Sequence, residues 1–204
     1  MSQTRLSLLV RVRNLSDGES WREFHAIYQP LIFAYLRDLG LRHDSADDLT
    51  QEVFRRLVKT MPSFVLDRQK ARFRTFLWKI TYSVLIDQVR ETKARDQVEE
   101  EWVRRFTVAY ESESQRLEEN WVRMHRKRIL ETALSRVRAR TKPTSWTCFE
   151  QRLLRNRPAV AIAGDLGMTA NAVYAYASRV LKEVRRQCAE LEEELGDGSD
   201  LDPL

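Results

Sequence analysis

Polar and basic residues recur with helical spacing near the end of this 204-residue chain, in the stretch from Ala161 to Arg186. A helix that begins near Ala170 places the following residues on one face: Asn171, Tyr174, Ala175, Ser178, Arg179 and Lys182. Asn amides and Arg guanidinium groups can hydrogen-bond to base edges, and the basic end around Arg185 and Arg186 can meet phosphates. The other face is apolar, with Val173, Ala177, Val180, Leu181 and Val184.

The spacing of Ala163, Gly167 and Val173 matches the helix-turn-helix pattern. A small residue lets two helices approach at a steep angle, and Gly167 can take the left-handed conformation that ends a helix predicted at about 159–166. Thr169 can cap the next helix, which this geometry pushes toward a DNA major groove. An ordinary helical hairpin with a solvated basic face fits the same spacing, so both interpretations stay open from these residues alone.

The composition favours a soluble, all-helical protein: 43% of the residues are hydrophobic, 32% are charged, and there are only 6 Gly and 5 Pro. The net charge of +5 permits a polyanionic partner without requiring one. Two cysteines and three histidines are scattered, without the spacing of a zinc site or a disulfide framework. We therefore predict no metal, no cofactor and no catalytic residue. The apolar run LSLLV is too short to span a membrane, so we expect a cytoplasmic protein without membrane insertion.

Helical periodicity defines a first domain at about 15–92. An apolar stripe from Trp21 to Leu39 predicts a helix that Pro30 kinks or divides and Gly40 ends. A second helix is expected from Asp44, as its cap, to about Thr60, and a third begins at Phe73.

Residues 93–115 are charged and irregular, and they predict a linker that is at most partly helical. A second domain at 116–190 follows, with a helix through 117–137, a short helix that Thr144 or Ser145 can cap, and the pair of helices described above. Residues 191–204 are predicted to be an acidic, flexible tail. The expected fold class is all-α, with two small helical domains joined by a charged linker.

Three segments resemble one known family: ADDLTQEVFRRL (46–57), KARFRTFLWKI (70–80) and IDQVR (86–90). They look like region 2 of bacterial RNA polymerase sigma-70 factors, in the short extracytoplasmic-function (ECF) type. The helix-turn-helix candidate resembles region 4 of the same family. The resemblance covers most of the chain in the expected order.

The resemblance implies a sigma factor without enzymatic activity, which binds core RNA polymerase through the β′ clamp helices and the β flap and directs promoter-specific initiation at the nucleoid. The implied core-binding residues on the second helix are Asp48, Gln51, Glu52 and Arg55. The residues implied to capture the −10 element as single-stranded DNA are Phe64, Arg68, Lys70, Arg72, Arg74 and Lys79. The residues implied to read the −35 element as duplex DNA are Thr169, Asn171, Tyr174, Ser178, Arg179 and Lys182.

Where the family commonly has Arg-Asn, this chain has Tyr82-Ser83, so contacts at those positions are not carried over. An anti-sigma partner is typical of the family, but no residue here identifies one. Two alternatives remain: a stand-alone helix-turn-helix transcription regulator, and a helical protein-interaction adaptor. A nucleic-acid-processing enzyme is a more distant third.

Overall fold

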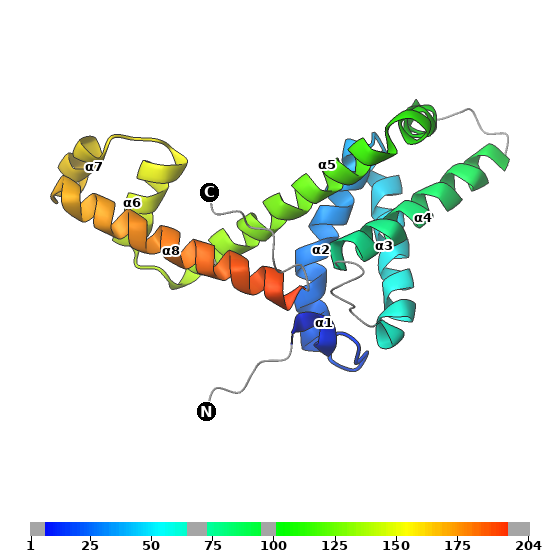
Figure 1. The fold of residues 1–204 in the computed structure, drawn as a ribbon, viewed down its shortest axis with the longest axis horizontal. Coiled ribbons are helices and arrows are strands. Elements are labelled where there is room, and N and C mark those ends of the chain that lie inside the picture. Colours follow the sequence, from blue (N-terminus) through cyan, green and yellow to red (C-terminus); the bar gives the residue numbers. More distant parts are fainter. Residues whose placement is uncertain (1–6, 65–72, 95–100, 196–204) are drawn as a thin grey trace. The chain divides into compact units, whose positions relative to one another are not determined.

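A computed structural model of the chain describes residues 7–64, 73–94 and 101–195, and the secondary structure of these residues is helical (Figure 1). The predicted all-α class is therefore confirmed. Contacts divide the chain into unit 1, residues 1–128 with 193–204, and unit 2, residues 129–192.

Unit 1 begins earlier than the predicted first domain. The short helix α1 (Leu8–Arg11) buries Leu8 and Leu9, and its Arg11 pairs with Glu23 at 3.0 Å. Helix α2 (Gly18–Asp38) starts at the N-cap Asp17, whose side chain accepts a hydrogen bond from the Ser20 amide. This bond lowers the pKa of Asp17, because it stabilises the carboxylate.

The sequence predicted the end of α2 correctly but not the residue that caps α3 (His43–Thr60). Gly40 has a φ of 93°, so it ends α2 in the left-handed region as expected. The predicted cap at Asp44 is wrong, because the N-cap of α3 is Arg42 and Asp44 lies in its first turn. A carboxylate there still interacts favourably with the helix dipole.

After α3 the chain forms the short 3-10 helix η1 (Met61–Ser63). Helix α4 (Phe73–Ala94) follows the undescribed residues 65–72. Helix α5 (Glu101–Arg140) is 40 residues long. It takes up most of the segment predicted as a linker and continues into the predicted second domain. The predicted boundary at 115/116 lies inside this helix, whereas the division between the units falls at 128/129.

A proline inside α2 explains how α5 is held in unit 1. Pro30 continues the helix but has no N–H, so the carbonyl of Ala26 loses its usual helical donor. Arg128 of α5 replaces it: its Nη2 donates to the Ala26 oxygen at 2.6 Å, and its Nε donates to the Ile27 oxygen at 3.0 Å. We expected Pro30 to kink or divide the helix. Instead α2 is a single helix, and the carbonyl of Ala26 accepts its hydrogen bond from Arg128 of α5.

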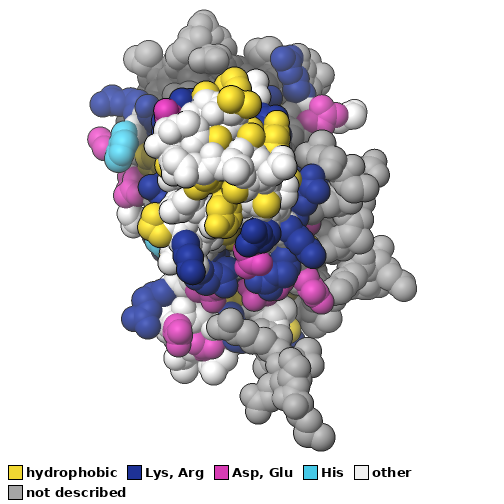
Figure 2. Space-filling model, turned by 90° about the vertical axis from the view of Figure 1, so that its left-hand side faces the viewer, with side chains coloured by type: hydrophobic (Ala, Val, Ile, Leu, Met, Phe, Trp, Pro, Cys, Tyr) yellow, Lys and Arg dark blue, Asp and Glu magenta, His cyan; other side chains and the backbone are white. Residues whose placement is uncertain are grey.

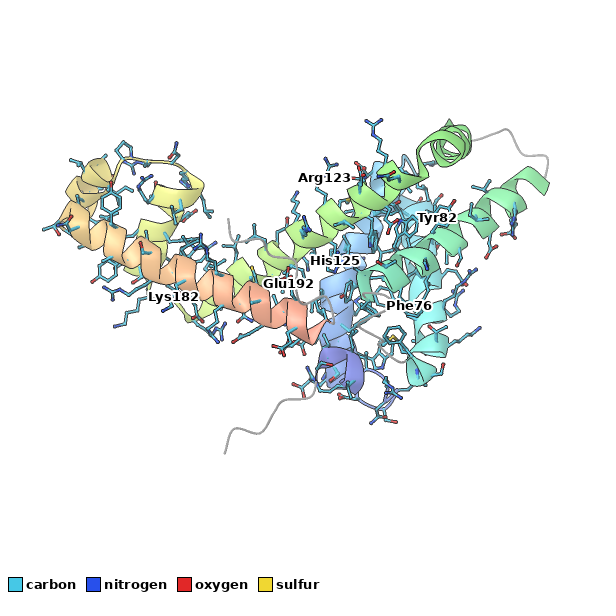
Figure 3. The ribbon with its side chains drawn as sticks, in the orientation of Figure 1. Phe76, Tyr82, Arg123, His125, Lys182 and Glu192 are labelled. Carbon is cyan, nitrogen blue, oxygen red and sulfur yellow. The ribbon has the colours of Figure 1, made fainter. Side chains whose placement is uncertain are left out.

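Three further residues of α5 hold the same part of the helix in unit 1. The indole N–H of Trp121 donates to the carbonyl of Arg74 at 3.0 Å, and its ring packs edge-on against Tyr35. Asn120 donates to Asp38 at 2.7 Å. His125, labelled in Figure 3, is 2% exposed, and its ring stacks on Tyr28 at 5.9 Å between ring centroids.

Unit 2 contains the end of α5, α6 (Pro143–Phe149), the π-helix η2 (Glu150–Leu154), α7 (Ala159–Leu166) and most of α8 (Ala170–Glu194). The predicted caps Thr144 and Ser145 are wrong: α6 has Lys142 as its N-cap and Pro143 in its first turn, where a fixed φ and a missing N–H cost nothing. Helix α8 includes residues 191–194 of the predicted tail, and residues 196–204 lie outside the described part.

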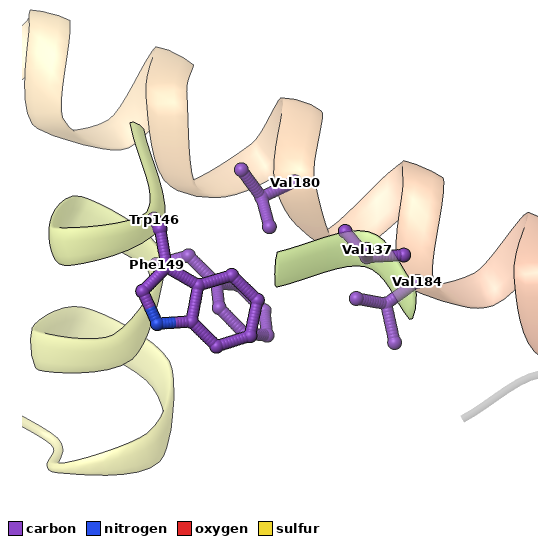
Figure 4. Close-up of a cluster of buried hydrophobic side chains, with 5 residues drawn as sticks. All are labelled: Val137, Trp146, Phe149, Val180 and Val184. Atoms are coloured by element: carbon purple, nitrogen blue, oxygen red, sulfur yellow. The ribbon is translucent and has the colours of Figure 1, made fainter. Parts of the chain in front are cut away.

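Two apolar clusters hold α8 to its neighbours within unit 2. The first joins the end of α5, α6 and α8 through Val137, Trp146, Phe149, Val180 and Val184 (Figure 4). The second joins α6, α7 and the start of α8 through Cys148, Ala159, Ile162, Ala163 and Val173. The buried face of α8 is therefore the one that the periodicity predicted.

The Pro30–Arg128 contact gives a first prediction. Replacing Arg128 with Met removes two charge-assisted hydrogen bonds and should lower the free energy of unfolding by about 1–2 kcal/mol. In a Pro30→Ala background the new amide can donate to the Ala26 carbonyl. Arg128→Met should then lower the free energy of unfolding by at least about 0.5 kcal/mol less than it does in the wild-type background. Urea unfolding of the four proteins measures this coupling, and equal losses in both backgrounds would refute the assignment.

His125 gives a second prediction. Burial, with smaller contributions from Arg74 and Arg126, lowers the pKa of His125 from 6.5 to about 3. Below pH 6.5 the unfolded chain takes up a proton that the folded chain excludes, so stability falls as the pH drops toward 3.

The expected slope that His125 contributes well below pH 6.5 is about 1.4 kcal/mol per pH unit. A His125→Phe variant keeps a ring against Tyr28 but has no titrating group. The difference in unfolding free energy between the two proteins, followed from pH 7.5 to pH 5, should shrink or reverse as the pH falls. A constant difference would show that His125 takes up its proton equally in the folded and unfolded states, so that burial does not lower its pKa.

Candidate nucleic-acid interface

The predicted core-binding residues lie on one face of α3. Opposite them, Leu49, Val53 and Leu57 are buried in unit 1. Asp48 and Gln51 are exposed, and Gln51 donates to Asp47 at 3.0 Å. Helical periodicity therefore predicted the face correctly, and it presents a carboxylate and an amide to solvent.

Glu52 and Arg55 are also on α3, but Glu52 is partly committed within the chain. It pairs with Arg55 and accepts a hydrogen bond from Arg56 at 3.0 Å. Arg56 reaches α4 as well, where it donates to Ser83 at 3.0 Å and pairs with Asp87 at 2.9 Å.

The structural role of Arg56 was missed at the level of sequence. The only local signal is the four-residue step from Glu52 to Arg56, which is common on solvated helices. The consequence is that Glu52 helps to orient the group that links α3 to α4, whereas Asp48 and Gln51 are the more available members of the face.

Three of the predicted −10 residues are described: Phe64, Arg74 and Lys79. Arg68, Lys70 and Arg72 lie outside the described residues. The ring of Phe64 lies 5.6 Å from that of Phe73 and 4.4 Å from that of Phe76. Phe73 is fully buried, and it also contacts Phe24 and Tyr28 of α2. Phe64 thus belongs to an aromatic cluster at the start of α4.

Two further aromatic residues on α4 were not predicted from the sequence to bind DNA. Trp78 and Tyr82 are half-buried, and their rings stack at 5.3 Å between centroids. Tyr82 and Phe76 both lie on α4, and exposed Lys79 comes between them in sequence (Figure 3). The four-residue step from Trp78 to Tyr82 was a usable signal, since residues at that spacing share a helix face. Helix α4 therefore combines aromatic surface with cations.

The turn between α7 and α8 has the predicted local geometry. Gly167 has a φ of 60° and a ψ of 38°, and the amide of Met168 donates back to the carbonyl of Ala163 at 3.0 Å. The hydroxyl of Thr169 accepts a hydrogen bond from the amide of Ala172 at 3.2 Å, so it caps α8 as expected. Ala163 and Val173 are buried in the same cluster, which holds the two helices together across the turn.

The residues predicted for duplex DNA are all exposed on α8 or at its start: Thr169, Asn171, Tyr174, Ser178, Arg179 and Lys182. The expected basic end is less available than its sequence indicated. Arg186 donates to Glu183 at 3.0 Å and pairs with Glu190, and the hydrogen bond from Arg186 lowers the pKa of Glu183. The cations of this face that these pairs leave available are Arg179 and Lys182.

Neither cysteine resembles an activated nucleophile. Burial raises the pKa of both thiols, Cys148 and Cys188, which disfavours the reactive thiolate. Within the described residues, no group of three acidic, His or Cys side chains could hold a metal ion. The same residues contain no helix long and apolar enough to cross a bilayer.

Residues 24–95 match the family described as Sigma-70 region 2. The match begins within α2 and extends just past the end of α4, so it covers both the α3 face and the aromatic start of α4. A search of curated proteins gave no match. The match supports the sigma-70 family, whose members are transcription factors rather than enzymes, and it implies core RNA polymerase and promoter DNA as partners.

Proposed function

We propose that this chain is a sigma factor of the ECF type that binds core RNA polymerase and directs promoter-specific initiation of transcription. The observation that carries the proposal is the Sigma-70 region 2 match at residues 24–95. The exposed pair Asp48 and Gln51 lies within the matched segment. Acidic and amide groups on one helix face suit a basic partner such as the β′ clamp helices.

The same match supports capture of the −10 element as single-stranded DNA at the start of α4. Binding an unpaired strand requires surfaces on which bases stack and cations that follow the backbone. Phe64, Trp78 and Tyr82 supply partly exposed aromatic surface, and Lys79 supplies an exposed cation. For this contact we propose the residues that the resemblance implies: Phe64, Arg68, Lys70, Arg72, Arg74 and Lys79.

Unit 2 would read the −35 element as duplex DNA and contact the β flap. Support comes from the left-handed turn at Gly167, the Thr169 cap and the exposed polar groups along α8. A helix held by its apolar face and exposed on the other suits insertion into a major groove. A stand-alone regulator would use the same geometry but would leave the region 2 match without a role.

Two weak DNA contacts suffice when both are held on one polymerase. Tethering makes the second contact intramolecular, so avidity replaces affinity in each module. Opening of the promoter then needs no catalytic residue, because binding to the unpaired strand shifts an existing opening equilibrium. The proposal therefore assigns no enzymatic step to this chain.

The α3 face gives the experiment that tests the proposal. Asp48→Arg reverses an exposed charge and leaves the Glu52–Arg56–Asp87 contacts in place, so the helices should stay packed. We expect wild-type protein to co-purify with core RNA polymerase and the variant to bind it about tenfold more weakly or worse. Lys59→Glu, a charge reversal at the exposed last turn of α3, is the matched control.

Circular dichroism checks that the three proteins fold alike. If the wild-type chain ignores core polymerase at low and moderate salt, the sigma-factor proposal fails. If wild type and Asp48→Arg bind equally well, the chain joins polymerase through another surface and the α3 assignment fails alone.

A further inference from the structure

The exposed face of α8 is more apolar than a surface that reads bases by hydrogen bonds alone. Tyr174 is 49% exposed, and Ala175 beside it is exposed as well. On α7, Val160 is 76% exposed. Figure 2 views this end of the chain and shows hydrophobic side chains gathered on it, with Lys and Arg side chains at their border.

An arginine outside the two-helix motif lies against this apolar surface. The guanidinium carbon of Arg152, in the π-helix η2, is 5.6 Å from the centroid of the Tyr174 ring. The π-helix is defined by the bond from the amide of Arg155 to the carbonyl of Glu150, which spans five residues. Single π-helical turns of this kind are frequent at functional sites, and they change the direction in which the following side chains point.

Two neighbouring arginines pair with acidic residues, whereas Arg152 pairs with none in the part of the chain that the structure describes. Arg155 pairs with Glu150 at 2.9 Å, and Arg157 pairs with Asp165 at 2.8 Å. The Nε of Arg152 is buried and has no hydrogen-bond partner among the described residues, none of whose carboxylates pairs with it. A cation fixed on an aromatic ring and left without an acid is positioned for an anion from outside the protein.

A second arginine is oriented in the same manner farther along α8. The guanidinium carbon of Arg179 is 5.0 Å from the centroid of the half-buried Tyr176 ring. The face thus has Asn171 at one end, Arg179 at the other, and Tyr174 with Ala175 between them. Tyr174 and Ala175 offer apolar contact there, with Arg152 against the Tyr174 ring and Arg179 farther along the helix.

We infer that Tyr174 and Arg152 form one DNA-reading element, in which the Tyr174 ring and Ala175 contact thymine methyl groups and Arg152 binds a backbone phosphate. The methyl group is the apolar feature of the major-groove edge, so an apolar protein surface selects thymine there. The phosphate supplies the anion that Arg152 does not find among the described residues. This inference rests on the proposed reading of duplex DNA by unit 2 and names the chemistry that it selects.

The test compares two random duplex libraries that differ only in thymine methyl groups. The full-length protein selects from a library made with thymidine and from one made with deoxyuridine, at low salt. The thymidine library should yield a motif with fixed thymines, and replacing one contacted thymine with deoxyuridine should weaken binding about fourfold. Tyr174→Ala should abolish the difference between thymidine and deoxyuridine, and Tyr174→Phe should retain it.

Arg152 has a separate readout. Arg152→Ala should weaken binding to all sequences alike and reduce the slope of log affinity against log salt by about one. Arg155→Ala is the matched control, since Arg155 lies three residues after Arg152 but is paired with Glu150. The slope of log affinity against log salt for this variant should stay near the wild-type value.

Each contrary outcome points to a different failure. Equal motifs from both libraries would overturn the thymine inference and leave duplex reading by unit 2 intact. Selection of no duplex by the wild-type protein would remove the proposed −35 function and the inference together. Unchanged DNA selection by both variants, with weaker binding to core polymerase, would assign this face to a protein contact.

Discussion

The carbonyl that Pro30 leaves open in α2 is the constraint on which much of unit 1 depends. Arg128, from a helix about a hundred residues farther along the chain, donates to this exposed carbonyl of Ala26 and to the part-buried carbonyl of Ile27. This fixes the rotation and the depth of α5 against α2. With α5 in place, Trp121 reaches the carbonyl of Arg74, so the same constraint extends to the start of α4.

The start of α4 is where structure and proposed function meet. Phe73 packs against Phe24 and Tyr28 of α2, and its ring also contacts that of Phe64, the last described residue before α4. Arg56 ties α3 to α4 farther along both helices. The exposed α3 face and the aromatic start of α4 are therefore presented by one packed group of helices. A surface that binds both polymerase and a DNA strand needs that rigidity, because its two contacts must be made in one register.

Periodicity in the sequence was sufficient to predict the helices and their buried faces. The stripes of α2, α3 and α8 are buried where three- and four-residue steps placed them, except that Val58 of α3, expected to face inward, is exposed. The turn at Gly167 follows from a residue type that alone takes that conformation freely. Local rules failed where a competing local rule was stronger, as at α6, where Pro143 sets the first turn before Thr144 or Ser145 can cap it.

Contacts distant in sequence could not be predicted in this manner. Nothing near Arg128 indicates that it will donate to Ala26, and nothing near Arg152 indicates that a π-helix will set it on Tyr174. Charged residues in 93–115 predicted a linker because side-chain polarity was taken to mean exposure without structure, whereas a polar helix forms when it continues from a packed one. The candidate faces were thus predictable, but the groups that orient their residues were not.

The most direct test of the central claim is transcription from fragmented genomic DNA of the source organism by purified core RNA polymerase, with and without this protein. The 5′ ends of the transcripts are mapped in both reactions. The account predicts start sites that appear only with the protein and share two upstream elements at a fixed separation, at the −10 and −35 positions. Identical 5′ ends in the two reactions, with a folded protein and an active core enzyme, would contradict it.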